Sequence, residues 1–261
     1  MDTAKGRIGA LVRGEANKGH TPILFLHGVG SDKGVWAPQV KHFAERRPAI
    51  AADYPGYGQS GLPLEATRED FADAMIALLD RLEIERAHIC GLSLGGIIAM
   101  LMADRAPSRI ASLILANTFA RHPDGRDIHD NSIEGARRFG MSGLARDRVD
   151  RLLGDNPPPG LREETIAVMS KIPEAAYRMG ARAVWLADLT SVAQKITRPT
   201  LVLCGEKDVV TPPELSNALA DLIEGAERLD IPEAGHLSNA ERPEAFNHAV
   251  EQFLSTVEQK V

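Results

Sequence analysis

The sequence predicts an α/β fold in which a mostly parallel, twisted sheet of about eight strands carries helices on both faces. Strand-like apolar runs alternate with segments of helical periodicity, which is the pattern of parallel strands joined by crossover helices. At 261 residues the chain is long enough for one such domain with an insertion. A hydrophobic fraction of 44% and a charged fraction of 25% are typical of a folded globular protein.

The first half of the chain alternates short apolar runs with amphipathic stretches. Apolar runs at 23–26 and 49–52 predict buried strands, each followed directly by a polar residue. Between 68 and 82 the apolar side chains recur at the spacing of one helix face, which predicts an amphipathic helix. We also expect a small hairpin within 7–19 and a helix over 34–46.

The second half continues this pattern but is interrupted once. An apolar run at 87–92 predicts a strand, and 94–105 predicts the helix that follows it. Between 119 and 196 the alternation stops, and Arg, Asp, Gly and Pro become frequent while apolar residues persist. We interpret 119–196 as an inserted helical cap of short helices, and 1–118 with 197–261 as the core. Further expected elements are strands at 113–116, 200–204 and 226–231 and a final helix at about 242–256.

The segment Gly91-Leu92-Ser93-Leu94-Gly95 stands between the predicted strand and the predicted helix. A serine at such a junction occupies a sharp, strained turn that exposes its hydroxyl, and glycines on either side allow close backbone approach. The following helix directs its free N–H groups and positive dipole end toward the serine. These features favour a nucleophile at Ser93 over the alternative of an ordinary helix-capping serine.

A serine nucleophile needs a general base, and the base needs an acid that orients it. Asp208 follows the run at 200–204, and His236 lies in a loop after the last predicted strand. The order Ser, Asp, His and the position of each residue after a strand indicate a catalytic triad. Asp208 could instead stabilise a helix N-terminus, but the preceding strand ends without a carboxylate, at Asn117-Thr118.

The oxyanion of a tetrahedral intermediate needs two backbone N–H donors near the nucleophile. Leu94 directly follows Ser93 and is expected to supply one of them. The loop after the first buried strand is expected to supply the other, from Val29. His27 in the same loop is interpreted as a structural residue that holds the loop by hydrogen bonding.

These motifs together resemble the α/β-hydrolase family, and they extend over the whole chain except the cap. Within that family the sequence is similar to 3-oxoadipate enol-lactonases, which hydrolyse a small, carboxylate-bearing lactone in the catabolism of aromatic compounds. The family motifs are His27-Gly28-Val29-Gly30, Asp53-Tyr54-Pro55-Gly56-Tyr57-Gly58-Gln59-Ser60, the serine segment, Gly205-Glu206-Lys207-Asp208 and Gly235-His236. The closer similarity is carried by Leu92-Ser93-Leu94-Gly95-Gly96, Ala116-Asn117-Thr118 and His236-Leu237-Ser238-Asn239-Ala240-Glu241-Arg242-Pro243.

The cap contains many arginines and few lysines. The planar guanidinium binds carboxylates in a bidentate manner, so a cap arginine is a candidate for contact with a substrate carboxylate. We expect Arg138 or Arg146 in this role, and we expect Trp185 either to line the pocket or to pack inside the cap. The alternative for each arginine is a solvated surface position paired with one of the cap's aspartates.

The resemblance and the triad together imply a serine hydrolase that forms an acyl-enzyme with a small ester or lactone. Two alternatives remain: the same triad could cleave a C–C or amide bond, or the chain could be a ligand-binding or receptor protein that kept the triad. Dehalogenases and epoxide hydrolases are disfavoured, because they use a carboxylate where this chain has Ser93.

We expect a small-molecule substrate as the binding partner, and neither nucleic acid nor a membrane. The net charge of −6 argues against nucleic acid, and the apolar stretches are too short to span a membrane. The first six residues lack the apolar core of a signal peptide, which favours a cytoplasmic protein with reduced cysteines. Scattered histidines and the lack of a dinucleotide fingerprint predict no metal and no cofactor. The sequence is compatible with a monomer or a homodimer.

Overall fold

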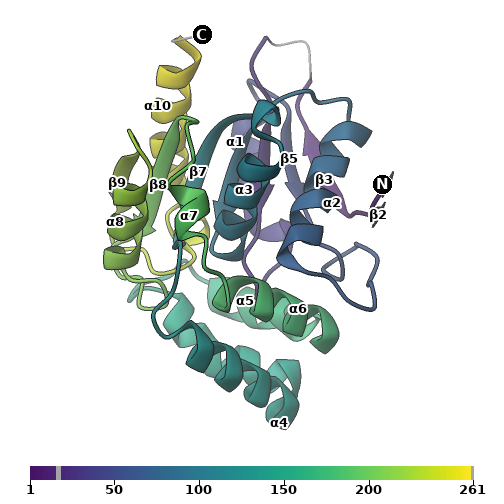
Figure 1. Ribbon diagram of the computed structural model, residues 1–261. Coiled ribbons are helices and arrows are strands. Elements are labelled where there is room, and N and C mark those ends of the chain that lie inside the picture. Colours follow the sequence, from purple (N-terminus) through teal and green to yellow (C-terminus); the bar gives the residue numbers. More distant parts are fainter. Residues whose placement is uncertain (16–18, 260–261) are drawn as a thin grey trace.

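The computed structural model describes residues 1–15 and 19–259 and confirms the predicted α/β class. Within these residues, seven strands form one sheet in the order β3-β5-β4-β6-β7-β8-β9 (Figure 1), where about eight were expected. All neighbouring pairs are parallel except β3 with β5. The strands are β3 (Ala10–Arg13), β4 (Ile23–Leu26), β5 (Ala49–Ala52), β6 (Ala87–Leu92), β7 (Ile110–Ala116), β8 (Thr200–Gly205) and β9 (Glu227–Ile231).

The N-terminal segment differs from the expected hairpin over 7–19. A small hairpin forms earlier, between β1 (Asp2–Thr3) and β2 (Gly6–Arg7), and β3 instead pairs antiparallel with β5. Every residue of β5 is buried, so β3 covers an apolar sheet edge that an isolated hairpin would leave open. Residues 16–18 of the expected hairpin lie outside the described residues.

Helices cover both faces of the sheet, because the central strands are buried on both sides. In β4 and β5 every residue is buried, and alternate residues join two separate cores. The first core includes α2 (Arg68–Arg81), α3 (Leu94–Arg105) and α8 (Pro213–Leu222). The second includes α1 (Ala37–Phe43) and α10 (Pro243–Gln259). Short helices complete the core at η2 (Lys33–Trp36), η3 (Pro107–Arg109) and α9 (Ser238–Glu241).

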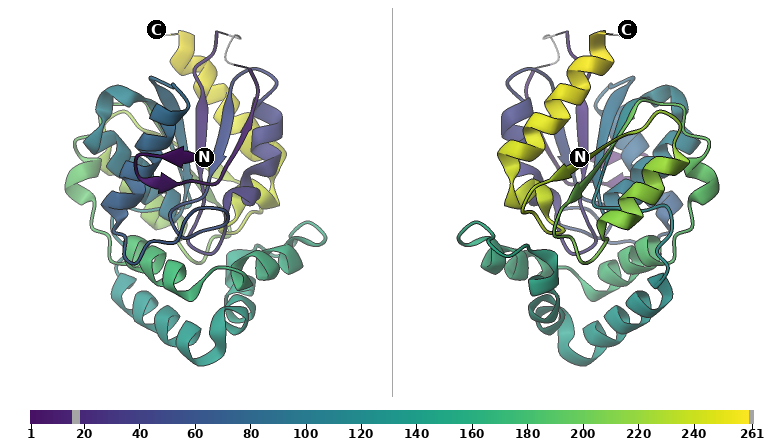
Figure 2. Two further views of the ribbon diagram at one scale, coloured as in Figure 1. Left: turned by 90° about the vertical axis from the view of Figure 1, so that its right-hand side faces the viewer. Right: turned by 90° about the vertical axis from the view of Figure 1, so that its left-hand side faces the viewer.

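The cap (119–196) lies at one end of the sheet, opposite the end where the chain terminates (Figures 1 and 2). It leaves the core after β7 and returns before β8, and its two ends are joined to each other. The Leu189 N–H donates to the Ala120 carbonyl at 2.8 Å, and Arg121 and Asp188 form an antiparallel bridge. The cap helices are α4 (Gly125–Leu152), α5 (Leu161–Ser170), α6 (Glu174–Trp185) and α7 (Thr190–Ala193).

Helix α4 is longer than the short pieces expected in the cap. It spans 28 residues and is kinked at Gly140, whose φ of 65° and ψ of 172° interrupt the helical geometry. A positive φ of this kind favours glycine, which explains why the kink occurs at this residue. The kink divides α4 into two arms, and the second arm returns the chain to the core (Figure 1).

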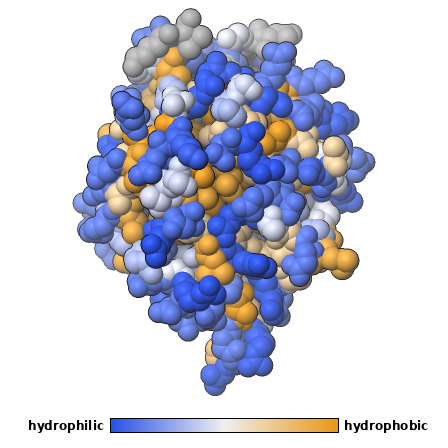
Figure 3. Space-filling model, viewed as in Figure 1, coloured by the Kyte–Doolittle hydropathy of each residue, from blue (hydrophilic) through white to orange (hydrophobic). Residues whose placement is uncertain are grey.

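The surface shown in Figure 3 is mostly hydrophilic, with hydrophobic residues scattered among charged ones. Single exposed apolar residues are normal on globular proteins. Over residues 1–15 and 19–259, no helix combines the length and the apolar character that crossing a bilayer requires.

Candidate active site

Ser93 occupies the sharp turn between β6 and α3. Its backbone has a φ of 56° and a ψ of −115°, a conformation that non-glycine residues rarely adopt. The Ser93 N–H donates to the Ala116 carbonyl at 2.9 Å, and the Thr118 hydroxyl donates to the Ser93 carbonyl at 2.8 Å. The strand β7 and the loop after it therefore hold the strained turn in place.

The glycines around Ser93 are required by close contacts between backbone segments. A Cβ atom on Gly91 would collide with the backbone of Gly95, and one on Gly95 would collide with the Leu26 carbonyl of β4. A Cβ on Gly96 would collide with the Thr118 side chain. The turn can form only where these positions carry no side chain.

Asp208 and His236 lie together beyond the carboxyl ends of β8 and β9. The Nδ1 atom of His236 is 2.8 Å from Oδ2 of Asp208. The other carboxylate oxygen, Oδ1, accepts the backbone N–H groups of Val210 and Thr211 at 2.8 and 2.9 Å. The Thr211 hydroxyl and the Asn117 amide donate to Oδ2 at 2.7 and 2.8 Å. The carboxylate is therefore fixed by donors from three separate segments.

The environment keeps Asp208 ionised. Burial alone would raise its pKa, but the charge of His236 and the hydrogen bonds from His236, Asn117 and Thr211 lower the pKa to about 2. An ionised carboxylate can only accept hydrogen bonds, so the Nδ1 atom of His236 carries the proton. The Nε2 atom of the same ring then has a free lone pair, as a general base requires.

Asn117 contacts the candidate site, a role that was not expected from the sequence, where the position was noted for its lack of a carboxylate and as part of the family resemblance. Its φ is 48°, and its side-chain amide donates to both Asp208 and the Gly235 carbonyl. Its side-chain oxygen, Oδ1, accepts a hydrogen bond from the Ser238 hydroxyl. The available signal was a polar residue at the carboxyl end of a central strand, where sites collect in parallel sheets.

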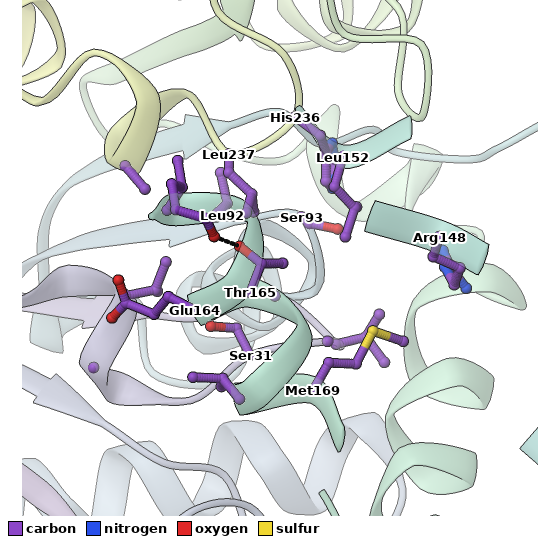
Figure 4. A pocket seen from close by; sticks show the side chains of 18 of the residues that line it. Ser31, Leu92, Ser93, Arg148, Leu152, Glu164, Thr165, Met169, His236 and Leu237 are labelled. Carbon is purple, nitrogen blue, oxygen red and sulfur yellow. Dashed lines mark hydrogen bonds between the residues drawn. The ribbon is translucent and has the colours of Figure 1, made fainter. Parts of the chain in front are cut away.

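Ser93 and His236 line a pocket of about 340 Å³ between the sheet and the cap (Figure 4). The walls are mainly apolar, with side chains from the core and from α5. The Ser93 hydroxyl forms no hydrogen bond with any other described residue, and bonds between a nucleophile and its base commonly tighten only when substrate fills the site. Other lining residues include Gly28, Val29, Ser31, Leu92, Arg148, Leu152, Glu164, Thr165, Met169, Trp185 and Leu237.

Of the two expected oxyanion donors, Val29 lines the pocket and Leu94 directly follows Ser93 in the chain. Neither the Val29 N–H nor the Leu94 N–H donates a hydrogen bond within the described chain, so both are available to a ligand. His27 holds the Val29 loop: its Nδ1 contacts the Gly28 carbonyl at 2.8 Å, and its Nε2 accepts the Tyr54 N–H at 3.4 Å. Burial lowers the pKa of His27, which suits the neutral ring that these two contacts need.

The structure does not bring Arg138 or Arg146 into this pocket. Both are exposed: Arg138 stacks on the ring of Phe139 at 5.0 Å, and Arg146 donates to Ser142. Arg138 instead borders a separate, more open cavity of about 720 Å³ beside α4. Successive residues of a helix point about 100° apart, so the phase of α4 decides which arginine faces inward.

Arg148 is the cap arginine that lines the pocket with Trp185. Its guanidinium donates to the Tyr177 hydroxyl at 2.7 Å and lies 5.8 Å from the centre of the Trp185 ring. In the part of the chain described, no carboxylate lies within ion-pair distance of Arg148. Arg148 therefore lines the pocket without an ion-pair partner, and Glu164 is the acidic residue that lines the same pocket.

Comparisons with known proteins agree on one family. A model of the alpha/beta hydrolase family matches residues 23–249. The chain is 30% identical to 3-oxoadipate enol-lactonase 2 of Acinetobacter baylyi over 240 residues, covering 89% of this chain and 88% of that protein. It is 29% identical to a 2-hydroxymuconate semialdehyde hydrolase of a Pseudomonas species, covering 90% and 87%. The structure of an enol-lactonase from Burkholderia xenovorans superposes with a TM-score of 0.91 and 29% identity over 98% of this chain and 99% of that one.

Proposed function

The chain belongs to the alpha/beta hydrolase family, and we propose that it is a serine hydrolase that cleaves a small, carboxylate-bearing ester or lactone. The observation that carries this proposal is that His236, hydrogen-bonded to the buried Asp208, lines the same pocket as the strained Ser93. The similarity to two enol-lactonases, in sequence and in structure, supports a lactone or ester as the substrate.

The reaction follows from the positions of these groups. The Oγ atom of Ser93 attacks the substrate carbonyl while Nε2 of His236 accepts its proton, and Asp208 stabilises the resulting imidazolium. The oxyanion accepts the N–H groups of Val29 and Leu94, each of which contributes about 10²–10³ in rate. His236 then protonates the leaving oxygen, and water activated by the same ring hydrolyses the acyl-enzyme.

The charge of Arg148 supports a carboxylate on the substrate. The pocket is mainly apolar, and a guanidinium there gains most from an anionic partner that also excludes water. Tyr177 and Trp185 hold the guanidinium in place, which reduces the entropy lost when a ligand binds. The substrate would thus place its reacting carbonyl at Ser93 and its carboxylate toward α4.

The reaction class is tested with p-nitrophenyl acetate and a fluorophosphonate probe. We expect steady release of p-nitrophenol and, by mass spectrometry, covalent modification of Ser93. A panel of enol-lactones, aryl esters, amides and vinylogous diketones then identifies the bond that is cleaved fastest. A folded protein that is silent with both the ester and the probe would favour the ligand-binding alternative.

The substrate class is tested at Arg148 with a matched pair of esters. For Arg148→Met we expect kcat/KM to fall about 10- to 100-fold for mono-p-nitrophenyl succinate, because a hydrogen-bonded charge pair is lost. Its kcat/KM for uncharged p-nitrophenyl butyrate should change little. Arg146→Met is the control, since that side chain is exposed and outside the pocket. Equal losses on both esters would contradict a role in carboxylate binding.

A further inference from the structure

The side chain of Glu241 joins two segments that lie far apart in the sequence. It belongs to α9, and the residue is only 2% exposed. Its Oε2 atom accepts the Gly154 N–H at 2.7 Å, just beyond the end of the cap helix α4. Its Oε1 atom accepts the Gly235 N–H at 2.9 Å, directly before His236. One carboxylate thus contacts both the cap and the loop that carries the proposed base.

Backbone hydrogen bonds reinforce this junction. The Leu152 carbonyl at the end of α4 accepts the N–H groups of His236 and Leu237 at 3.0 and 3.2 Å. The segments approach so closely that a Cβ on Gly235 would lie 2.5 Å from the Gly154 nitrogen. The loop between β9 and α9, residues 232–237 (the histidine loop), is therefore bound directly to the end of α4.

The carboxylate of Glu241 suits the two backbone N–H groups that it accepts. Burial raises its pKa, and the two backbone N–H donors oppose that shift. Across the described residues the carboxylate pairs with no basic side chain, because the guanidinium of Arg242 donates to backbone carbonyls instead. Two backbone donors need two acceptor atoms at a fixed spacing, which a carboxylate supplies and an amide side chain does not. Charge burial without an ion pair is costly, so packing alone does not account for a glutamate here.

We propose that Glu241 is a positioning residue that fixes the histidine loop to the end of α4 and thereby sets His236 relative to Arg148. The proposal rests on the proposed serine hydrolase function. Arg148 and Leu152 are one helical turn apart on α4. The Leu152 carbonyl accepts the N–H groups of His236 and Leu237, so one turn of helix and these two hydrogen bonds connect Arg148 to the proposed base. Small misplacements of a base lower the rate strongly.

The test is Glu241→Gln, which keeps the shape of the side chain but removes one acceptor atom. We expect a folded protein in which kcat for p-nitrophenyl acetate falls about 10- to 100-fold while KM changes less than about twofold. The rate of fluorophosphonate labelling should fall with kcat, because both need the base in position. The preference for mono-p-nitrophenyl succinate over the neutral p-nitrophenyl butyrate should also decrease. Glu244→Gln, an exposed neighbour at the start of α10, is the matched control.

The possible outcomes distinguish failure of the positioning role of Glu241 from failure of the proposed serine hydrolase function. Wild-type protein that neither hydrolyses the esters nor reacts with the probe contradicts the proposed function. An active wild type with a Glu241→Gln variant that is less stable but has unchanged kcat and selectivity shows a purely structural role and overturns the positioning role. If Glu241→Gln does not fold, Glu241→Asp is measured in the same way, since its shorter carboxylate cannot reach both N–H groups.

Discussion

Ser93→Ala is expected to lower kcat for p-nitrophenyl acetate by about 10⁴–10⁶-fold while the protein remains folded. The substitution removes the only atom that forms the acyl-enzyme bond. The hydrogen bonds that hold this turn involve the Ser93 backbone N–H and carbonyl, so the alanine variant keeps them. The measurement is steady-state kinetics alongside thermal unfolding monitored by circular dichroism.

The control for this experiment is Ser255→Ala, which removes an exposed hydroxyl on α10. It should retain both turnover and fluorophosphonate labelling. The alanine variant at position 93 should lose labelling completely. Near-full hydrolysis by Ser93→Ala would mean that the acyl-enzyme mechanism is wrong, whatever the substrate.

Asp208→Asn is expected to reduce kcat by about 10⁴-fold, because the amide no longer selects the proton position on His236. Asp208 accepts only, from His236, Asn117, Thr211 and Val210, whereas an asparagine directs an NH₂ group at some of these donors. KM should change less than kcat, since Asp208 does not line the pocket. A variant with wild-type kcat would contradict the assignment of Asp208.

The difference in stability between the wild type and Asp208→Asn has a defined pH dependence. The pKa of Asp208 is about 2 in the folded chain, below its ordinary value of 3.8, so ionisation favours the folded state. This contribution is fully present above pH 3.8 and is lost as the pH falls through 2. Denaturant unfolding from pH 7 downward should show wild type more stable than Asp208→Asn, with the difference decreasing below about pH 4. A difference that grows on acidification would contradict the lowered pKa.

The sequence predicted the parts of the site that follow from strand order. Ser93 comes directly after a run that proved to be a parallel strand, and Asp208 and His236 lie in the loops that follow two others; the carboxyl ends of such strands meet at one edge. The structure brings all three to that edge, as the order along the chain predicted. The need for glycines beside Ser93 was also predictable, because a sharp strand-to-helix turn brings the residues that flank the serine close to neighbouring segments.

Other parts depend on contacts that local patterns do not contain. Arg148 lines the pocket whereas Arg146, two residues earlier in the same arm of α4, points elsewhere, and Arg138 lies before the kink at Gly140. Glu241 contacts Gly154, which lies 87 positions away in the sequence, and no periodicity indicates such a contact. The edge strand β3 likewise pairs with β5, which lies far along the chain, because burial of β5 decides the pairing rather than the nearest turn signal.

The junction where the cap begins and ends has a consequence for how such proteins diversify. Because Ala120 and Leu189 are hydrogen-bonded neighbours, the chain leaves and re-enters the core at one place, and a different insertion could be grafted there. Substrate recognition by the insertion could then change while the catalytic residues of the core stay the same. The graft is constrained at the histidine loop: a foreign segment must present a carbonyl where Leu152 now stands and an N–H where Gly154 stands, or the loop loses its support.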